Sequence, residues 1–309
     1  MIAACREKGS PVCVGLDPVF EKLPTDVLTS DDLRDMATGE ASQLDRRAFA
    51  IHDYCSEVID AVAEHVPAIK LQSACFERYG TTGLEVYHEL TEQARLSGLI
   101  VIADCKRGDI GISAEHYAAA CLADPPEDLI GEDEPTHGPD ALTINSYLGS
   151  DGIEPFTKVG RATGKGLFAL VRTSNPGGDA IQSLKLTTGE TVAEAVAKII
   201  ASLGSGEGLV GESGYSLLGA VVGATKASDA ASLRALMPQQ IFLVPGFGAQ
   251  GGKADDVKAC FNSDGRGAIV TASRSVIYAF EKDKSGPWKM AVERAARQMK
   301  KDVNAAIGG

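Results

Sequence analysis

Charged residues occur at the ends of two apolar segments, where their types and spacing could support proton transfer. Residues 104–110 read Asp-Cys-Lys-Arg-Gly-Asp-Ile and follow an apolar run, and Lys70 lies within the apolar segment 68–72. Successive side chains of an extended strand alternate in direction, so Asp104 and Lys106 point to the same side. A buried ammonium at Lys70 requires a carboxylate partner, because an unpaired charge is too costly in a low-dielectric interior. The pattern predicts that Asp104 pairs with Lys70.

The same residues could instead form a structural ion pair. An Asp-x-Lys-x-x-Asp spacing, here Asp104 to Asp109, arises by chance in about one chain in twenty of this length. An ion pair that only stabilises the ends of strands would use the same residue types. Residues at the ends of the other predicted strands must therefore decide between the two interpretations.

Two further segments have the composition of a phosphate site. Residues 245–252 read Pro-Gly-Phe-Gly-Ala-Gln-Gly-Gly, and Ser273-Arg274 follows the last apolar run. Glycines allow backbone N–H groups to approach a phosphate, and arginine offers two parallel donors. A flexible loop and an ordinary surface arginine are the alternative. The two segments follow the seventh and eighth predicted strands. In a barrel of parallel strands and helices, the loops after these two strands commonly bind phosphate.

Two weaker signals remain open from the residues alone. Asp17, followed by Pro18, could contact a sugar hydroxyl or could cap the next turn. Ser174, in the segment Ser-Asn-Pro-Gly, could contact a polar heterocycle or belong to an ordinary turn.

Short apolar segments bounded by turn residues alternate with segments of helical periodicity. Residues 46–65 and 190–203 show helical periodicity, and the order strand–helix–strand predicts a parallel sheet covered by helices. Eight such strands favour a closed (β/α)8 TIM barrel, whereas an open sheet is the fallback. A dinucleotide fingerprint is missing after the first strand, where Gly-Leu-Asp-Pro stands. The predicted strands are 11–17, 67–72, 98–104, 140–145, 166–172, 217–223, 241–246 and 267–273.

Residues 1–309 are predicted to form a single barrel domain with two surface insertions. The insertions are placed near 18–45 and 122–140, both rich in turn formers. Residues 122–140 contain seven acids and four prolines without lysine or arginine, a composition that favours a solvated loop.

Composition and charge exclude several classes of protein. The chain of 309 residues is 44% apolar and 23% charged, which is typical of soluble globular proteins. Its net charge of −12 disfavours binding to nucleic acid or anionic membranes. Any phosphate ligand must therefore be bound by a local positive site.

The cysteines and histidines predict neither disulfides nor a metal site. Seven cysteines are scattered without a C-x-x-C pair, which fits a reducing, cytoplasmic compartment. No signal-like apolar segment is expected at the amino terminus. The five histidines lack ligand spacing, so we expect no metal.

Together, the motifs at the strand ends resemble those of the orotidine 5′-phosphate decarboxylases, in particular the longer bacterial (type 2) branch. They occur in family order over nearly the whole predicted barrel, which is more specific than any single motif. The segments that carry the resemblance are 12–18, 69–70, 104–110, 174–177, 245–252 and 273–274.

The resemblance implies conversion of orotidine 5′-monophosphate to uridine 5′-monophosphate and carbon dioxide, in de novo pyrimidine biosynthesis and without a cofactor. It also implies a homodimer with shared active sites. Lys70, Asp104 and Lys106 would form a charge network with Lys106 as proton donor, completed by Asp109 from the neighbouring subunit. The other implied contacts are Ile110 and Ser113 at the shared site, Asp17 on the ribose, Ser174 on the pyrimidine amide edge, and Gly246, Gln250 and Arg274 on the phosphate.

Two alternatives accompany this interpretation. A magnesium-dependent sugar-phosphate decarboxylase of the same superfamily shares the Asp-x-Lys-x-x-Asp pattern, but Lys70 stands where such an enzyme needs an acidic ligand and would repel the cation. A non-catalytic nucleotide-binding barrel is the second alternative. Binding alone has no need of buried like charges beside an anion.

Overall fold

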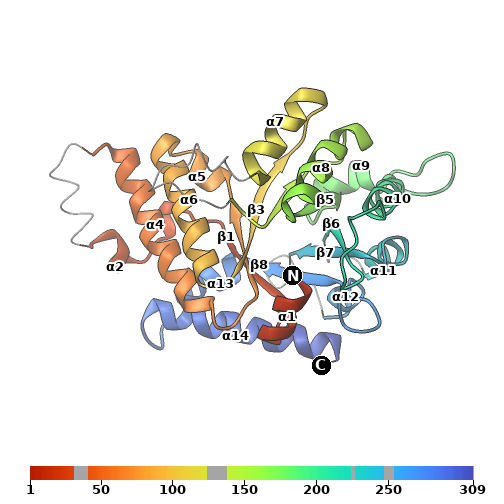
Figure 1. Ribbon diagram of the computed structural model, residues 1–309. Coiled ribbons are helices and arrows are strands. Elements are labelled where there is room, and N and C mark those ends of the chain that lie inside the picture. The colour runs from red at the N-terminus through yellow and green to blue at the C-terminus, as the bar shows by residue number, and fades with distance from the viewer. Residues whose placement is uncertain (31–40, 124–137, 224–226, 247–253, 309) are drawn as a thin grey trace.

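The computed structural model describes residues 1–30, 41–123, 138–223, 227–246 and 254–308. Within these residues eight parallel strands pair in sequence order, and pairing of the first strand with the eighth closes a barrel (Figure 1). The predicted (β/α)8 barrel is therefore confirmed. The strands are β1 (Val12–Leu16), β2 (Ala68–Gln72), β3 (Ile100–Arg107), β4 (Ala141–Ile144), β5 (Gly166–Arg172), β6 (Ser216–Val222), β7 (Gln240–Pro245) and β8 (Ala268–Ala272).

Strand β3 continues beyond its predicted end at residue 104. The other strand ends agree with the predicted ranges to within two residues. In β3 the register with β4 shifts between Ala103 and Arg107, and Arg107 pairs with Ile144. The Lys106 N–H donates to Thr143 Oγ1 at 3.0 Å instead of to a strand carbonyl. This irregularity lies within the charged motif and lengthens the strand to Arg107.

Apolar side chains fill the barrel interior toward the amino ends of the strands. Inward-facing residues of neighbouring strands, among them Ile102, Phe168 and Ile269, form one buried core. Met1 and Ile2 pack against this core, so helix α1 (Ile2–Lys8) covers that end of the barrel. The sequence analysis did not predict this helix. The carboxyl ends of the strands are left for polar residues.

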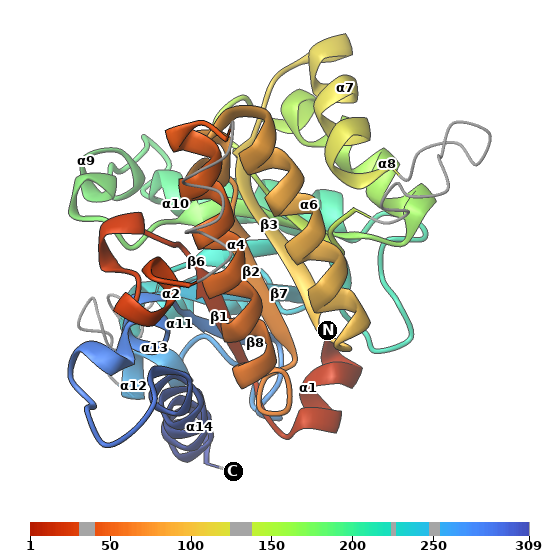
Figure 2. The same cartoon turned by 90° about the vertical axis from the view of Figure 1, so that its left-hand side faces the viewer.

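Two of the outer helices begin with capping boxes. Helix α4 starts with a capping box between Ser42 and Asp45, and helix α10 with one between Thr191 and Glu194. The first is observed at Gln43–Val62 instead of 46–65, and the second at Val192–Gly204 instead of 190–203. Helices α4 and α6 (Gly80–Leu96) lie side by side over the strands (Figure 2).

The remaining helices complete the layer around the barrel. Helix α14 (Trp288–Ile307) lies beside α1, where Lys300 Nζ and Asn304 Nδ2 donate to the carbonyls of Lys8 and Gly9 at 2.6 and 2.9 Å. No described helix is long and apolar enough to cross a membrane. The helices not yet named are α2 (Thr25–Leu28), α5 (Ala74–Glu77), α7 (Gly111–Leu122), α8 (Glu154–Thr163), α9 (Asp179–Gln182), α11 (Ala227–Leu236), α12 (Ala254–Lys258) and α13 (Arg274–Ile277), with short 3-10 turns at Phe20–Lys22, Ser150–Gly152, Pro176–Gly178 and Ala279–Glu281.

The described part of the first predicted insertion contains helical structure. Its described part contains the turn Phe20–Lys22 and helix α2, and α4 begins at Gln43, inside the predicted range 18–45. The sequence analysis placed the helix start too late because the capping box at Ser42 was not used. Most of the second insertion, residues 124–137, lies outside the described residues.

Candidate active site

The carboxylate of Asp104 is the centre of the polar cluster at the carboxyl ends of the strands. Its Oδ2 accepts hydrogen bonds from Lys70 Nζ at 2.7 Å and Gln72 Nε2 at 3.2 Å. Its Oδ1 accepts from Lys106 Nζ at 2.6 Å and Thr143 Oγ1 at 3.0 Å. An ionised carboxylate offers about four acceptor positions, so these donors use its full capacity. Asp104 therefore joins two ammonium groups in one network.

The register of the barrel brings these residues together. Gln72 at the end of β2 pairs with Asp104, and Lys70 pairs with Ile102 two residues earlier. Both charged side chains are inward-facing and each residue is 7% exposed. Lys70 Nζ also lies 3.4 Å from Asp17 Oδ1, at the point where the chain leaves β1. The buried ammonium thus has two carboxylate partners.

Opposite charges in the network outweigh the effect of burial on both buried groups. Burial disfavours the charged form of Asp104, but Lys70 and Lys106 lower the pKa of its carboxyl to about 2. Burial likewise disfavours the ammonium of Lys70, but Asp17 and Asp104 raise its pKa above the usual range. Asp104 is therefore ionised and Lys70 is protonated at neutral pH.

Lys106 differs from Lys70 in exposure and in backbone conformation. Its side chain is 47% exposed, against 9% for Lys70. Among the described residues, Lys106 is the one non-glycine residue with a positive φ, 47°. Such a conformation costs about 1 kcal/mol or more and persists only where the surroundings hold it. Here the bonds of Lys106 to Thr143 and Asp104 hold it, and its ammonium remains open to a ligand.

A cavity of about 210 Å³ opens beside this network. It lies at the carboxyl ends of the strands, which is where (β/α)8 barrels carry their active sites. Polar and apolar side chains from seven strands and the loop after β5 surround it. The lining residues are Lys70, Asp104, Lys106, Thr143, Leu170, Thr173, Ser174, Asn175, Val221, Leu243, Pro245 and Thr271.

Comparison with known proteins matches nearly the whole chain to the family that the strand-end motifs resemble. Residues 10–285 match the Orotidine 5′-phosphate decarboxylase / HUMPS family. The chain is 41% identical over 310 residues to orotidine 5′-phosphate decarboxylase of Rhodopirellula baltica, covering 97% of this chain and 96% of that protein. A solved structure from Streptomyces avermitilis is 33% identical, with a TM-score of 0.76 and coverage of 99% of this chain and 94% of its own. The structure of Leishmania donovani OMP decarboxylase is 26% identical, with a TM-score of 0.73 and coverage of 100% and 98%.

The chain belongs to the orotidine 5′-phosphate decarboxylase / HUMPS family.

Several residues that the family resemblance singled out meet at this cavity. Lys70, Asp104 and Lys106 form the network, and Ser174 lines the same cavity. Asp17 joins the network through Lys70. The residues to which the resemblance to orotidine 5′-phosphate decarboxylases gives these roles therefore share one site.

Three predicted residues do not reach the cavity of their own chain. Among the described residues no ion pair joins Asp109 to Lys106, and Asp109 Oδ1 instead accepts from the Ile110 N–H at 2.8 Å. Ile110 is 56% exposed, and Ser113 is exposed on α7. All three residues lie on the surface beyond β3.

Two of the three predicted phosphate residues, Gly246 and Arg274, lie at the same end of the barrel as the network. Gly246 follows the cavity residue Pro245 and has a φ of 99°, a conformation that favours glycine. Arg274 is the first residue of α13, directly after β8, and its side chain is exposed. Gln250 lies outside the described residues.

Sequence reasoning missed the polar residues that support the network without carrying charge. Gln72 and Thr143 donate to Asp104, and Thr271 lines the cavity from β8. Each is a polar residue inside or at the end of an otherwise apolar strand. That is the same signal that singled out Lys70, and it could have identified them.

Removing the charge of Asp104 should destabilise the protein in a pH-dependent way. We expect Asp104→Asn to lower the free energy of unfolding by about 3 kcal/mol at pH 7, because two lysines lose their shared partner. The pKa of Asp104 is about 2 in the folded protein, against about 3.9 in an unfolded chain. Its contribution is therefore complete above the unfolded value and is lost as pH falls toward 2.

Urea denaturation of wild type and variant from pH 7 to pH 3 measures this difference. The difference in free energy of unfolding between wild type and variant should become smaller below about pH 4. Asp26→Asn, an exposed residue of α2, changes the net charge equally and serves as control; its effect should stay within about 0.5 kcal/mol. A gap that stays constant over the whole range would contradict the assigned network.

Proposed function

We propose that this protein decarboxylates orotidine 5′-monophosphate to uridine 5′-monophosphate. The single observation that carries the proposal is the half-exposed ammonium of Lys106, bound to buried Asp104 at the mouth of the cavity. Membership of a family whose curated relatives bear the name of this activity supports it. The reaction belongs to pyrimidine nucleotide biosynthesis.

The chemistry requires a cation beside carbon 6 of the pyrimidine ring. When the carboxylate leaves as carbon dioxide, its bonding electrons remain on carbon 6. An ammonium directed at that atom stabilises the transition state more than the substrate. Lys106 then delivers a proton to carbon 6, while Asp104 holds the ammonium in place. Lys70 compensates the negative charge of the carboxylates that it contacts. No metal or organic cofactor enters these steps.

One charge contact cannot account for the whole acceleration. At about 4 Å and an effective dielectric of about 20, it supplies roughly 4 kcal/mol, or about three decades in rate. Binding of the remote phosphate must supply more by aligning the ring. We assign the phosphate to Gly246, Gln250 and Arg274, the ribose hydroxyls to Asp17 and the pyrimidine amide edge to Ser174.

We further propose a homodimer in which each site is completed by Asp109, with Ile110 and Ser113, from the neighbouring subunit. Asp109 has no cationic partner in its own chain among the described residues. Exposed apolar side chains follow it at the start of α7 and within that helix, and others lie on the loop after β4; such exposed apolar groups mark a protein interface. They are Ile110 (56% exposed), Ile112 (71%), Tyr117 (41%), Tyr147 (80%) and Leu148 (48%).

The chain as a whole is proposed to be one barrel domain with insertions near 18–45 and 122–140, located in the cytoplasm. All seven cysteines are free thiols, which fits a reducing compartment.

Two substitutions separate chemistry from binding. We expect Lys106→Ala to lower kcat at least about 1000-fold, because the cation beside carbon 6 is lost. Arg274→Ala should lower kcat/KM roughly 10- to 100-fold while turnover remains measurable, because it removes charge-assisted bonds to the phosphate. Ultraviolet absorbance follows the consumption of orotidylate. Lys198→Ala, an exposed lysine of α10, is the matched control and should behave as wild type.

Near-normal turnover by Lys106→Ala would show that the assignment is wrong. The same assay with a chelator distinguishes the magnesium-dependent alternative, which would lose activity. The proposed enzyme should be unaffected. Tight uridylate binding without any turnover by the wild type would favour the non-catalytic alternative.

Mixing two inactive variants tests the shared site. Lys106→Ala and Asp109→Ala each disable both sites of a homodimer. In a mixed dimer one of the two sites retains both residues, so equal mixing should restore about a quarter of wild-type activity. Differently tagged subunits confirm that mixed dimers have formed. If such dimers form and stay inactive, or if Asp109→Ala alone is fully active, the shared site is refuted.

A further inference from the structure

Arg172, the last residue of β5, has a buried side chain to which the sequence analysis assigned no role. Only 4% of that side chain is exposed. The register of β5 with β6 shifts between Leu170 and Arg172. Leu170 lines the catalytic cavity, whereas the partners of Arg172 belong to helices outside the barrel. The irregularity therefore turns a cation away from the cavity and into the helical layer.

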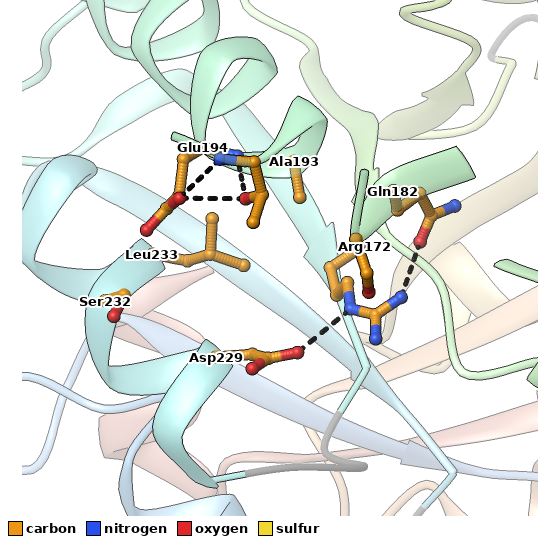
Figure 3. A pocket seen from close by; sticks show the side chains of 9 residues that line it. Arg172, Gln182, Ala193, Glu194, Asp229, Ser232 and Leu233 are labelled. Atoms are coloured by element: carbon orange, nitrogen blue, oxygen red, sulfur yellow. Dashed lines mark hydrogen bonds and ion pairs between the residues drawn. The ribbon is translucent and has the colours of Figure 1, made fainter. Parts of the chain in front are cut away.

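The guanidinium of Arg172 binds three side chains from two helices. Figure 3 shows two of these partners, Asp229 and Gln182. Its Nε donates to Asp229 Oδ2 of α11 at 3.3 Å, and its Nη1 donates to Gln182 Oε1 of α9 at 3.2 Å. Its Nη2 donates to the carboxylate of Asp179. Two carboxylates thus compensate one buried cation, as burial requires. The planar group, with donors in fixed directions, joins α9 and α11 to the end of β5.

Gln182 also forms hydrogen bonds with Thr173. The Thr173 N–H donates to Gln182 Oε1 at 2.9 Å, and Gln182 Nε2 donates to Thr173 Oγ1 at 2.8 Å. A Cβ at Gly178 would lie only 2.8 Å from Thr173 Oγ1, so glycine is needed for this approach. Both the backbone and the side chain of Thr173 are fixed by one glutamine.

Ser174 is confined from the other side by the end of β6. The Gly223 N–H donates to the Arg172 carbonyl at 2.7 Å, and a Cβ at Gly223 would lie 2.9 Å from the Ser174 nitrogen. Thr173 and Ser174 both line the catalytic cavity, as does Lys106. The position of Ser174 in the cavity wall thus depends on contacts made outside the barrel.

We infer that Arg172 and Gln182 are positioning residues for substrate, acting through Thr173 on the contact of Ser174 with the pyrimidine ring. This inference rests on the proposed function of the cavity. Neither residue lines the catalytic cavity. Because both act through the segment that carries Ser174, their effect should follow binding of the base and leave binding of the sugar phosphate unchanged. A displacement of about 1 Å at such a contact is enough to reduce activity strongly.

A second cavity beside Arg172 makes the test practicable. It measures about 270 Å³ and is lined by Arg172, Gln182, Glu194 and Asp229, among others. Arg172→Lys keeps the charge within this space but cannot span three partners. Gln182→Ala removes the partner of Thr173 without leaving a buried charge unpaired. Both variants are therefore expected to fold.

The experiment compares binding of uridylate with binding of ribose 5-phosphate, which lacks the base. We expect Arg172→Lys, Gln182→Ala and Ser174→Ala each to weaken the binding of uridylate about tenfold, which corresponds to the loss of one hydrogen bond. The affinity for ribose 5-phosphate should not change. The double variant Arg172→Lys, Ser174→Ala should bind uridylate no more weakly than Ser174→Ala alone, because the effects of substitutions at coupled residues do not add. Isothermal titration measures both affinities, and thermal melting confirms folding.

Arg95→Lys is the matched control. Arg95 Nη1 donates to the Gly138 carbonyl at 2.9 Å and to Asp140 Oδ1 at 2.8 Å, near the amino ends of β3 and β4. Its substitution changes a comparable arginine–aspartate contact at the opposite end of the barrel. Both affinities should match those of the wild type.

Three results would overturn the inference: wild-type uridylate affinity in folded Arg172→Lys and Gln182→Ala, equal weakening of both ligands, or additive effects in the double variant. The proposed function fails separately. If the wild type binds uridylate but releases no carbon dioxide from orotidylate, the decarboxylase assignment is wrong, while the binding data still decide the positioning role.

Discussion

One buried carboxylate shared by two ammonium groups is the interaction on which the site depends. Asp104 is nearly excluded from solvent, and burial alone would disfavour its charge. Lys70 and Lys106, with hydrogen bonds from Gln72 and Thr143, compensate that cost and keep the carboxyl ionised. In return, the carboxylate fixes the direction of Lys106 while the lysine remains half exposed. Without this anion Lys106 would lose its carboxylate partner, and Lys70 would keep only the longer contact with Asp17.

The barrel supplies the rigidity that such a cluster requires. Lys70 and Asp104 lie on paired strands above an apolar core, where their positions follow from the register. Sites built on strands are held more closely than sites built on loops. The residues that we propose for the rest of the nucleotide follow the ends of the strands. One of these segments, after β5, is itself held by Arg172 and its partners in the helical layer. The charged network thus depends on the barrel, whereas the proposed base contact depends on the layer around it.

Local sequence predicted the eight strands and the pairing of Lys70 with Asp104, because side-chain alternation and burial of an apolar run are properties of a single segment. It did not predict the positive φ of Lys106 or the shifted register at Arg172. Both depend on how one strand pairs with its neighbour, which no local pattern records. Asp109 is a different case. The family resemblance, and no property of the segment itself, suggested its role across an interface, and in its own chain Asp109 lies apart from Lys106.

A crystal structure with uridylate bound would test the central claim most directly, through the distance from Lys106 Nζ to carbon 6 of the base. The account predicts about 4 Å or less, the range in which a charge contact supplies the stabilisation invoked above, with Asp104 still bound to both lysines. A base bound elsewhere, or an ammonium of Lys106 directed into solvent away from carbon 6, would contradict it.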